Sequence, residues 1–267
     1  MPPLRCPQRG PRDDAESTWL THTTPNEGNP IDTQSEDDDF LVPRMATWVV
    51  WLAFLLPLTV SGAGFILARS YDWTFGWLYL GILGANLAIQ TVMVLIWNPV
   101  LISRRSTFGG NTKRWDIVIL ILLTLCILGI FLTLRMDQQA LGPAYQPGWA
   151  WLLASVVFAL GMGMMTWSSV INPFLEKTVR IQDDHQHQVI DTGPYALVRH
   201  PFYVGCIALL LATPVMLASV TSWIPALGCV LVLVVRTALE DRTLQAELAG
   251  YQDYATRVRA RLLPGVY

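Results

Sequence analysis

Polar residues of several kinds cluster in the segment DTGPYALVRHPFYVG, which begins at residue 191. Pro201 keeps His200 out of helical geometry and is itself well suited to the first position of a helix. We therefore expect Arg199, His200 and Tyr203 to lie at a helix N-terminus, where backbone amides favour an anionic group. Gly205, one turn further on, would let a flat ligand approach the backbone.

A second group of charges follows a long apolar stretch. Arg236 and Glu240 are four residues apart, on one face of a predicted helix, and Asp241 is beside them. An ordinary ion pair is one interpretation, but Arg before Glu is the less favourable order for helix stability. A charged pair that emerges from an apolar helix is a candidate functional site.

The elements that must position these residues are apolar. Of the 267 residues, 52% are hydrophobic and 14% are charged, and the mean hydropathy of +0.40 is typical of a polytopic membrane protein. Apolar runs of about 20 residues can cross a bilayer as helices. They predict spans at about 46–68, 75–97, 116–135 and 149–171, and a hairpin of two short spans, about 202–220 and 223–236, around the sequence TSWIP. We thus predict an all-α, polytopic helical membrane protein with six transmembrane segments.

Basic residues predict the orientation of these spans, because loops rich in Lys and Arg stay on the cytoplasmic side. The loop 98–115, the loop 172–201 and the segment after 236 carry most of them, whereas the opposite loops hold only Arg69 and Arg135. This distribution predicts an integral membrane protein with both termini in the cytosol. The polar motif and the Arg236 and Glu240 pair would then meet at the cytosolic face.

The two ends of the chain differ from the membrane body. Residues 1–44 are rich in Pro, Ser, Thr and acidic side chains and predict a disordered tail. After the last span, apolar residues at three- and four-residue steps from Leu244 to Leu262 predict a cytosolic amphipathic helix, with a break at Gly250. We divide the chain into this tail, a four-span bundle over 45–171 and a catalytic region over 172–267.

Several motifs together resemble the integral-membrane isoprenylcysteine carboxyl methyltransferase family, to which phospholipid N-methyltransferases are related. They are GPYALVRHPFYVG, the apolar hairpin after it, RTALED at 236–241, and GYQDYATRVRARLLPGVY at 250–267. The segments NPVLISRR, KRWD and NPFLEKTVRIQ, between residues 98 and 182, also resemble bacterial members. The likeness covers about 98–267 and implies a location in a bacterial inner membrane.

This resemblance implies S-adenosylmethionine as cofactor and a lipophilic small molecule or prenylated compound as substrate. Arg236 would face the substrate, and Arg236 and Glu240 would be the catalytic pair. Asp241 stands where the family has a second glutamate, so a direct role for it is open. The residues that the resemblance assigns to the cofactor are His187, Gln188, Val189, Ile190, Tyr195, His200, Pro201, Phe202, Tyr203 and Glu240. Arg199 and Gly205 join them from their place at the helix N-terminus.

Methyl transfer fits these residue types. The reaction is a single displacement at an activated carbon, so positioning is the main task, and an acceptor carboxylate could be held bidentately by Arg236. His200 at a helix N-terminus would stay neutral and act as a hydrogen-bonding contact. We expect the lipid bilayer as a partner, and neither a nucleic acid nor a metal.

Other interpretations remain open. The sequence DDHQH at 183–187 offers metal-ligand types, but a solvated loop with few histidines argues against a metal site. An NADPH-dependent membrane reductase of the sterol-reductase type shares an Arg-His-Pro-x-Tyr stretch, although such proteins usually have more spans. Methyl transfer to an amine or a thiol is a further alternative. A scaffold or transporter is disfavoured because the charges gather at one face, not at mid-membrane.

Overall fold

The structure, a computed structural model, describes residues 74–106, 113–140, 147–175 and 187–265. Within these ranges the regular secondary structure is entirely helical. The helices are α2 (Thr74–Trp97), α3 (Pro99–Ser106), α4 (Arg114–Ala140), α5 (Gly148–Ile171), a short 3-10 turn (Gly193–Ala196), α6 (Pro201–Met216), α7 (Trp223–Glu247) and α8 (Tyr251–Arg257). The predicted tail 1–44 and the predicted first span 46–68 lie outside the described residues.

The predicted all-α, polytopic membrane fold is confirmed. Four helices in the described part of the chain, α2, α4, α5 and α7, are long and apolar enough to cross a membrane. Their bounds lie close to the predicted runs, because about 20 consecutive apolar residues leave few other ways to satisfy the backbone in lipid. The hairpin also forms, although α6 has only 16 residues and ends before the predicted position 220.

A buried polar group explains why α6 ends early. The turn between α6 and α7 packs against the end of α4, where Asp137 is buried. Its Oδ2 atom accepts hydrogen bonds from the hydroxyl of Ser219 at 2.7 Å and from the amide of Thr221 at 2.9 Å. These bonds use polar groups of the turn that would otherwise lack partners in an apolar surrounding.

The prediction of a continuous loop over 98–115 is wrong for its first part. Pro99 opens the short helix α3, and the side chain of Asn98 donates to the carbonyl of Ser169 on α5 at 2.7 Å. Leu101 and Ile102 are buried against neighbouring apolar residues. The segment therefore folds back onto the helix ends, because packing removes the apolar surface of Leu101 and Ile102 from water.

The C-terminal break is confirmed. Helix α7 runs well past the predicted end at 236, and Gly250, with φ of 79°, separates it from α8. This left-handed conformation is one that glycine adopts without steric cost. Leu248, Tyr251 and Tyr254 then form a small buried cluster of their own.

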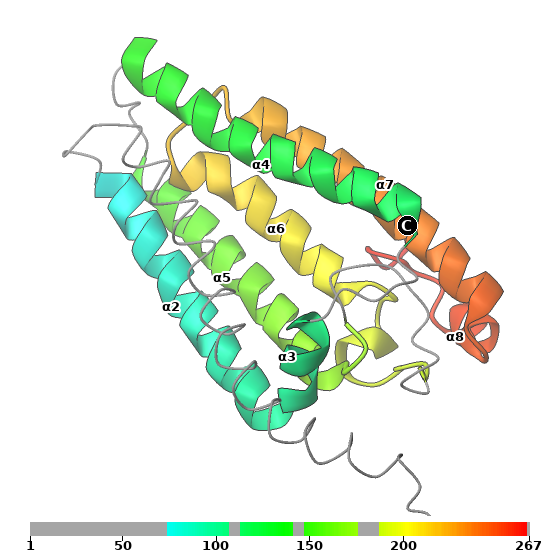
Figure 1. Ribbon diagram of the computed structural model, residues 1–267. Coiled ribbons are helices and arrows are strands. Elements are labelled where there is room, and N and C mark those ends of the chain that lie inside the picture. Colours follow the sequence, from blue (N-terminus) through cyan, green and yellow to red (C-terminus); the bar gives the residue numbers. More distant parts are fainter. Residues whose placement is uncertain (1–73, 107–112, 141–146, 176–186, 266–267) are drawn as a thin grey trace, which may run out of the picture. The chain divides into compact units, whose positions relative to one another are not determined.

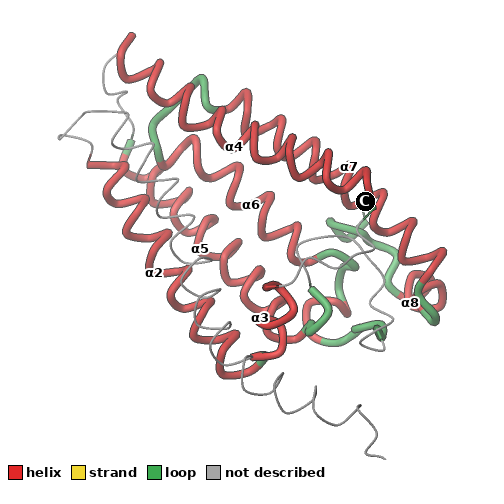
Figure 2. The backbone as a smooth tube through the Cα atoms, in the orientation of Figure 1, coloured by secondary structure: helices red, strands yellow, loops and turns green. Residues whose placement is uncertain are grey.

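The long helices contact one another in a different order from that of the chain. Helix α2 packs on α5, α5 on α6, α6 on α7, and α7 on α4. Figure 1 shows that α3, α8 and the start of α6 lie at one end of this row. Figure 2 shows that the non-helical segments which bear the polar motif gather at the same end. The hairpin thus starts and finishes beside the same loops, which brings residues near 200 and 240 together.

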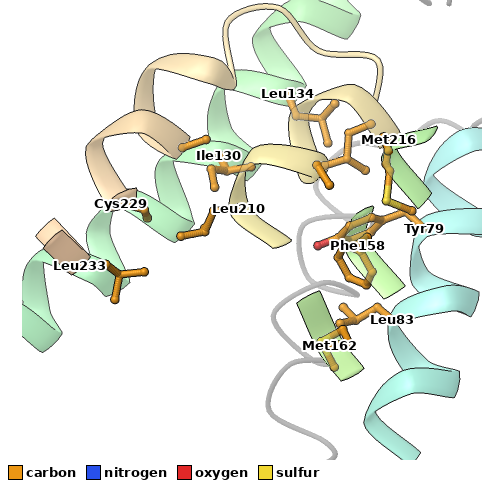
Figure 3. Close-up of a cluster of buried hydrophobic side chains, with 14 of the residues drawn as sticks. Tyr79, Leu83, Ile130, Leu134, Phe158, Met162, Leu210, Met216, Cys229 and Leu233 are labelled. Atoms are coloured by element: carbon orange, nitrogen blue, oxygen red, sulfur yellow. The ribbon is translucent and has the colours of Figure 1, made fainter. Parts of the chain in front are cut away.

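The core runs between these helices. Figure 3 shows Tyr79 of α2 beside Phe158 of α5. The two rings meet edge to face, with centroids 5.6 Å apart. Further along the row, Leu210 lies between α6 and α7 near Cys229 and Leu233. The division into a bundle over 45–171 and a region over 172–267 stays a prediction; α5 and α6, on either side of it, pack closely.

Candidate active site

The first part of the polar motif folds into a tight turn. Gly193 has φ of 59°, and Pro194 occupies the start of the 3-10 turn that follows. A Cβ at Gly193 would press on the end of the Ile171 side chain, which can shift, so the turn requires glycine chiefly for its positive φ. Tyr195 is buried in this turn, where its hydroxyl accepts a hydrogen bond from Asn172 at 3.1 Å.

The second part of the motif is fixed by the C-terminal segment. The amide of Arg199 donates to the carbonyl of Ala260, and the amide of His200 donates to that of Arg261, both at 3.0 Å. Pro201 is the first residue of α6, as predicted, and brings no amide hydrogen. The expectation that these backbone amides receive an anion is therefore wrong for Arg199 and His200, because each already has a carbonyl partner.

The carboxylate of Asp241 joins four segments of the chain. It has no exposed surface. Its Oδ2 atom accepts from Nη2 of Arg199 and from Nε of Arg261, both at 2.9 Å, and its Oδ1 atom lies 2.8 Å from Nε of Arg199 as an ion pair. The amide of Gln245 at 2.8 Å and the hydroxyl of Tyr251 at 3.0 Å complete this shell. Asp241 thus holds the motif, α7, α8 and the C-terminal segment together, and it neutralises the guanidinium that we expected to attract an anion.

His200 lies between two adjacent acids of α7. Its Nε2 atom is 3.4 Å from Oδ1 of Asp241, and its Nδ1 atom is 3.9 Å from Oε1 of Glu240. A carboxylate can only accept, so the contact with Asp241 requires the proton on Nε2. The ring stacks on that of Tyr203 with an interplanar angle of 12°. The histidine is therefore held on two sides.

Glu240 differs from Asp241 although the two are adjacent. It is partly exposed, and its Oε2 atom accepts a hydrogen bond from the hydroxyl of Tyr203 at 2.5 Å. Such a bond to a carboxylate is short and strong. Successive residues on a helix point in different directions, so one acid faces the buried network and the other faces a cavity.

That cavity lies at the end of the helix row and has mixed polar and apolar walls. Its volume is about 60 Å³, so a ligand larger than a few water molecules requires lining side chains to move outward. It is lined by Asn172, Leu175, His187, Gln188, Val189, Ile190, Tyr195, Arg199, His200, Phe202, Tyr203, Glu240, Leu244, Leu248, Tyr251 and Tyr254. We call it the polar cavity.

A second cavity of about 210 Å³ lies between the helices and is almost wholly apolar. It is lined by Leu123, Ile127, Met165, Phe202, Tyr203, Cys206, Leu209, Leu210, Cys229, Leu233 and Arg236. We call it the apolar cavity. Phe202 and Tyr203 belong to both walls, so the two cavities adjoin at these residues.

Arg236 is the charged residue in the wall of the apolar cavity. It is 7% exposed and forms an ion pair with Asp116, in which Nη2 donates to Oδ2 at 3.3 Å and Nε lies 3.0 Å from Oδ1. The centre of its guanidinium lies 5.7 Å from the ring centroid of Tyr203, within the range of a cation–π contact. Asp116 is in the first turn of α4 and is fully buried.

Two tyrosines close the polar cavity from α8. The hydroxyl of Tyr254 donates to the carbonyl of Tyr195 at 2.7 Å and so ties α8 to the motif turn. Burial raises the pKa of the Tyr254 phenol above its usual value. Burial, and then the carboxylate of Asp241, raise the pKa of Tyr251 as well. Both phenols therefore remain hydrogen-bond donors at neutral pH.

The structure brings most of the sequence-predicted site residues together. Ten of the twelve assigned to the cofactor line the polar cavity; Pro201 and Gly205 are not among its lining residues. Gly205 instead faces α5, where a Cβ would lie 2.5 Å from the carbonyl oxygen of Gly161. The expectation that Gly205 approaches a flat ligand is therefore wrong, because helix packing uses its free face.

Some residues of the site were not predicted from the sequence. Asn172, Leu244 and Tyr254 line the polar cavity, and Asp116 pairs with Arg236. The three- and four-residue spacing of Leu244, Tyr251 and Tyr254 was a signal for a buried face, but it did not show what that face covers. The pairing of Asp116 with Arg236 spans 120 residues and leaves no local pattern.

The histidine-rich segment gives no sign of a metal centre where it is described. His187 stacks on Phe174 with ring centroids 4.6 Å apart. Residues 183–186 lie outside the described residues. In the part of the chain that the structure covers, no group of three or more His, Cys, Asp or Glu side chains is placed to hold a metal ion.

Comparison with known proteins adds one match. No curated protein matches the chain. The model of the isoprenylcysteine carboxyl methyltransferase (ICMT) family matches residues 152–246, a range that contains the polar motif, the hairpin, Arg236 and Glu240. Over residues 152–246, the chain is therefore similar to the isoprenylcysteine carboxyl methyltransferase family, and the long apolar helices of the described residues accord with a membrane methyltransferase.

Proposed function

We propose that this protein transfers a methyl group from S-adenosylmethionine to a lipophilic acceptor, most simply a carboxylate, at the cytosolic face of a membrane. The observation that carries the proposal is the meeting of two unlike cavities at Phe202 and Tyr203. A water-soluble donor suits the polar cavity, and an acyl or prenyl chain suits the apolar one. The reaction would take place where the two adjoin.

The residues of the polar cavity fit such a cofactor. A sulfonium is a cation, and the aromatic ring of Phe202 together with the carboxylate of Glu240 favours a positive charge. Val189, Leu244 and Leu248 offer apolar surface for a purine ring. Bound there, the cofactor would supply a methyl group on a positively charged sulfur. In one step the acceptor would bond to the methyl carbon and the sulfur would leave. Glu240 and Tyr203 would orient it, and positioning of this kind accounts for much of the rate of a displacement.

The apolar cavity fits a lipophilic acceptor. Its volume of about 210 Å³ is bounded by aliphatic, aromatic and sulfur-containing side chains, with Arg236 as its cation. A carboxylate acceptor is already a nucleophile and requires no general base. The guanidinium would orient its oxygens, since arginine binds carboxylates through paired hydrogen bonds. Catalytic roles for Arg236 and Glu240 follow from this arrangement.

The orientation in the membrane follows from charge. The site end of the helix row carries Lys113, Arg114, Arg199, Arg236 and the arginines after Glu247. Basic residues favour the cytoplasmic side of a membrane. We infer that the polar cavity opens to the cytosol, where S-adenosylmethionine is present, and that both termini lie on that side of a bacterial inner membrane.

Two alternatives are kept for testing. An amine or a thiol acceptor would use the same donor and the same apolar cavity, and an Arg236 already paired with Asp116 is compatible with an uncharged acceptor. A reductase would instead bind NADPH, whose phosphates require cations; the site arginine Arg199 is occupied by Asp241. This pairing favours the methyltransferase.

The test measures cofactor binding and then the product. Detergent-purified protein should bind radiolabelled S-adenosylmethionine saturably and NADPH weakly or not at all. Glu240→Gln should weaken that binding by about tenfold or more, because it removes a charged hydrogen bond. Lys113→Gln is the matched control and should bind normally. It breaks an exposed ion pair with Glu247, which lies on α7 as Glu240 does. Saturable binding of NADPH alone would reject the proposal.

Membranes incubated with methyl-labelled cofactor then report the acceptor. Label that enters the lipid or small-molecule fraction and is released by mild base identifies a methyl ester, and hence a carboxylate acceptor. Label that is stable to base identifies a nitrogen or sulfur acceptor. Absence of any transfer, despite cofactor binding, would contradict the enzymatic proposal.

A further inference from the structure

The carboxylate of Asp116 pairs with Arg236, the charged residue in the wall of the apolar cavity. It is fully buried in the first turn of α4, and the positive end of that helix favours an acid there. Its Oδ2 atom accepts a hydrogen bond from Nη2 of Arg236 at 3.3 Å, and its Oδ1 atom lies 3.0 Å from Nε in the same ion pair. Helix α4 packs along α7, so the acid is presented from a rigid neighbour. The arginine is thereby fixed in the wall of the apolar cavity.

Arg236 has a second acid within reach on its own helix. Glu240 follows it by four residues, the spacing at which helical side chains meet. In the structure, however, Glu240 accepts the hydroxyl of Tyr203 at 2.5 Å and lines the polar cavity. The ring of Tyr203 separates the two functions, because its face lies toward Arg236 and its hydroxyl toward Glu240.

We propose that Asp116 is a positioning residue, which holds Arg236 at the apolar cavity and so leaves Glu240 to Tyr203 and the polar cavity. An unpaired guanidinium in this apolar surrounding is costly and seeks the nearest carboxylate. Without the charge of Asp116, that carboxylate is Glu240. Arg236 would then turn along α7, break the bond between Tyr203 and Glu240, and disturb both binding sites. The consequence for ligands depends on the function proposed above; the pairing itself does not.

The test compares Asp116→Asn with variants that separate positioning from structure. Asp116→Asn keeps the size of the side chain and removes its charge. We expect the affinity for S-adenosylmethionine to fall about tenfold, as for loss of one hydrogen bond to a charged group. Lys113→Gln removes an exposed ion pair between the residue that precedes α4 and Glu247 of α7, and should leave that affinity unchanged.

A double variant distinguishes the two roles. If Asp116 acts by keeping Arg236 away from Glu240, then Asp116→Asn combined with Glu240→Gln should bind the cofactor no more weakly than Glu240→Gln alone. If Asp116 only stabilises the contact between α4 and α7, the two losses should multiply, since effects of independent sites add in free energy. Multiplying losses, or normal affinity in Asp116→Asn, would overturn the proposal.

A spectroscopic readout keeps the test independent of methyl transfer. In protein labelled with ¹⁵N-arginine, the Nε–H resonance of Arg236 is assigned by its absence in Arg236→Lys. It should shift in Asp116→Asn, shift again when Glu240→Gln is added, and stay in place in Lys113→Gln. If wild-type protein binds no S-adenosylmethionine, the proposed function fails, while this resonance still decides whether Arg236 moves to Glu240. An unchanged resonance in Asp116→Asn refutes the positioning role.

Discussion

Gly161 and Gly205 bring the backbones of α5 and α6 into direct contact beside the site. A Cβ on Gly205 would lie 2.5 Å from the carbonyl oxygen of Gly161 and 2.6 Å from Cγ of Met165. Real Cβ atoms do not approach a carbonyl so closely. Because Phe202 and Tyr203 are less than one turn from Gly205, this contact sets the position of the wall that the two cavities share.

Gly205→Ala should therefore destabilise the protein by about 1–3 kcal/mol, the usual range for overpacking a filled interior. The measurement is thermal or denaturant unfolding of the detergent-purified protein. Gly163→Ala is the matched control, because Gly163 lies on α5 with no atom near its missing Cβ. That change should be neutral or slightly stabilising, as alanine is the better helix former. Equal stability of the two variants would contradict the packing role.

Tyr203→Phe tests the hydrogen bond from the Tyr203 hydroxyl to the carboxylate of Glu240. The ring and its contact with Arg236 remain, but Glu240 loses its short hydrogen bond. We expect cofactor affinity to fall by about tenfold, with little change in folding. Tyr79→Phe is a matched control, since Tyr79 is a buried tyrosine of the core between α2 and α5. Normal cofactor binding by Tyr203→Phe would remove this hydroxyl from the site.

Much of the fold was readable from the sequence for a simple physical reason. A helix is the economical way to carry 20 apolar residues through lipid, so α2 and α5 begin and end within a residue of the predicted runs. Helix α3 was missed because its apolar pair, Leu101 and Ile102, is too short to show periodicity. Helix beyond position 236 was predicted, but its continuity with the span as far as Glu247 was missed because its polar turns pack on protein instead of lipid.

The site was predictable to a different degree. Residues within the motif, such as His200 and Tyr203, were placed together because a helix N-terminus follows a proline. Gly205 was misassigned, because the sequence does not tell whether a glycine makes room for a ligand or for a neighbouring helix. Asp116 and Asp241 act through partners 120 and 42 residues away. Such pairs depend on which helices become neighbours, and that order, with α4 against α7, has no local signature.

The adjacent acids Glu240 and Asp241 should respond differently to loss of charge. Asp241→Asn leaves the buried guanidinium of Arg199 and that of Arg261 without their carboxylate. Breaking a buried pair in this way costs about 3–5 kcal/mol, so we expect a large loss of stability and little folded protein. Glu240→Gln, which changes a partly exposed residue, should fold normally. Unfolding of both variants is the measurement, and a stable Asp241→Asn protein would argue against its central structural role.

Tyr251 predicts a pH dependence of stability. Burial and the carboxylate of Asp241 raise its pKa above the value of about 10 found in unfolded chains. Its contribution is therefore complete below about pH 10 and is lost as the pH rises, because the unfolded chain then releases a proton that the folded protein retains. The free energy of unfolding should fall by about 1.4 kcal/mol per pH unit more in wild type than in Tyr251→Phe. Parallel pH profiles would contradict the assignment.

The C-terminal segment should be required for cofactor binding although it lies beyond the matched family region. Removal of residues after Arg257 deletes the carbonyls of Ala260 and Arg261, which accept from the amides of Arg199 and His200, and the side chain that helps to neutralise Asp241. It also deletes Leu262, which is buried in the main core. We expect the truncated protein to insert into membranes through its long helices but to lose binding of S-adenosylmethionine. Arg261→Gln separates the side chain from the backbone bonds: it should weaken binding less than the truncation does, and equal losses would assign the whole effect to the Asp241 contact.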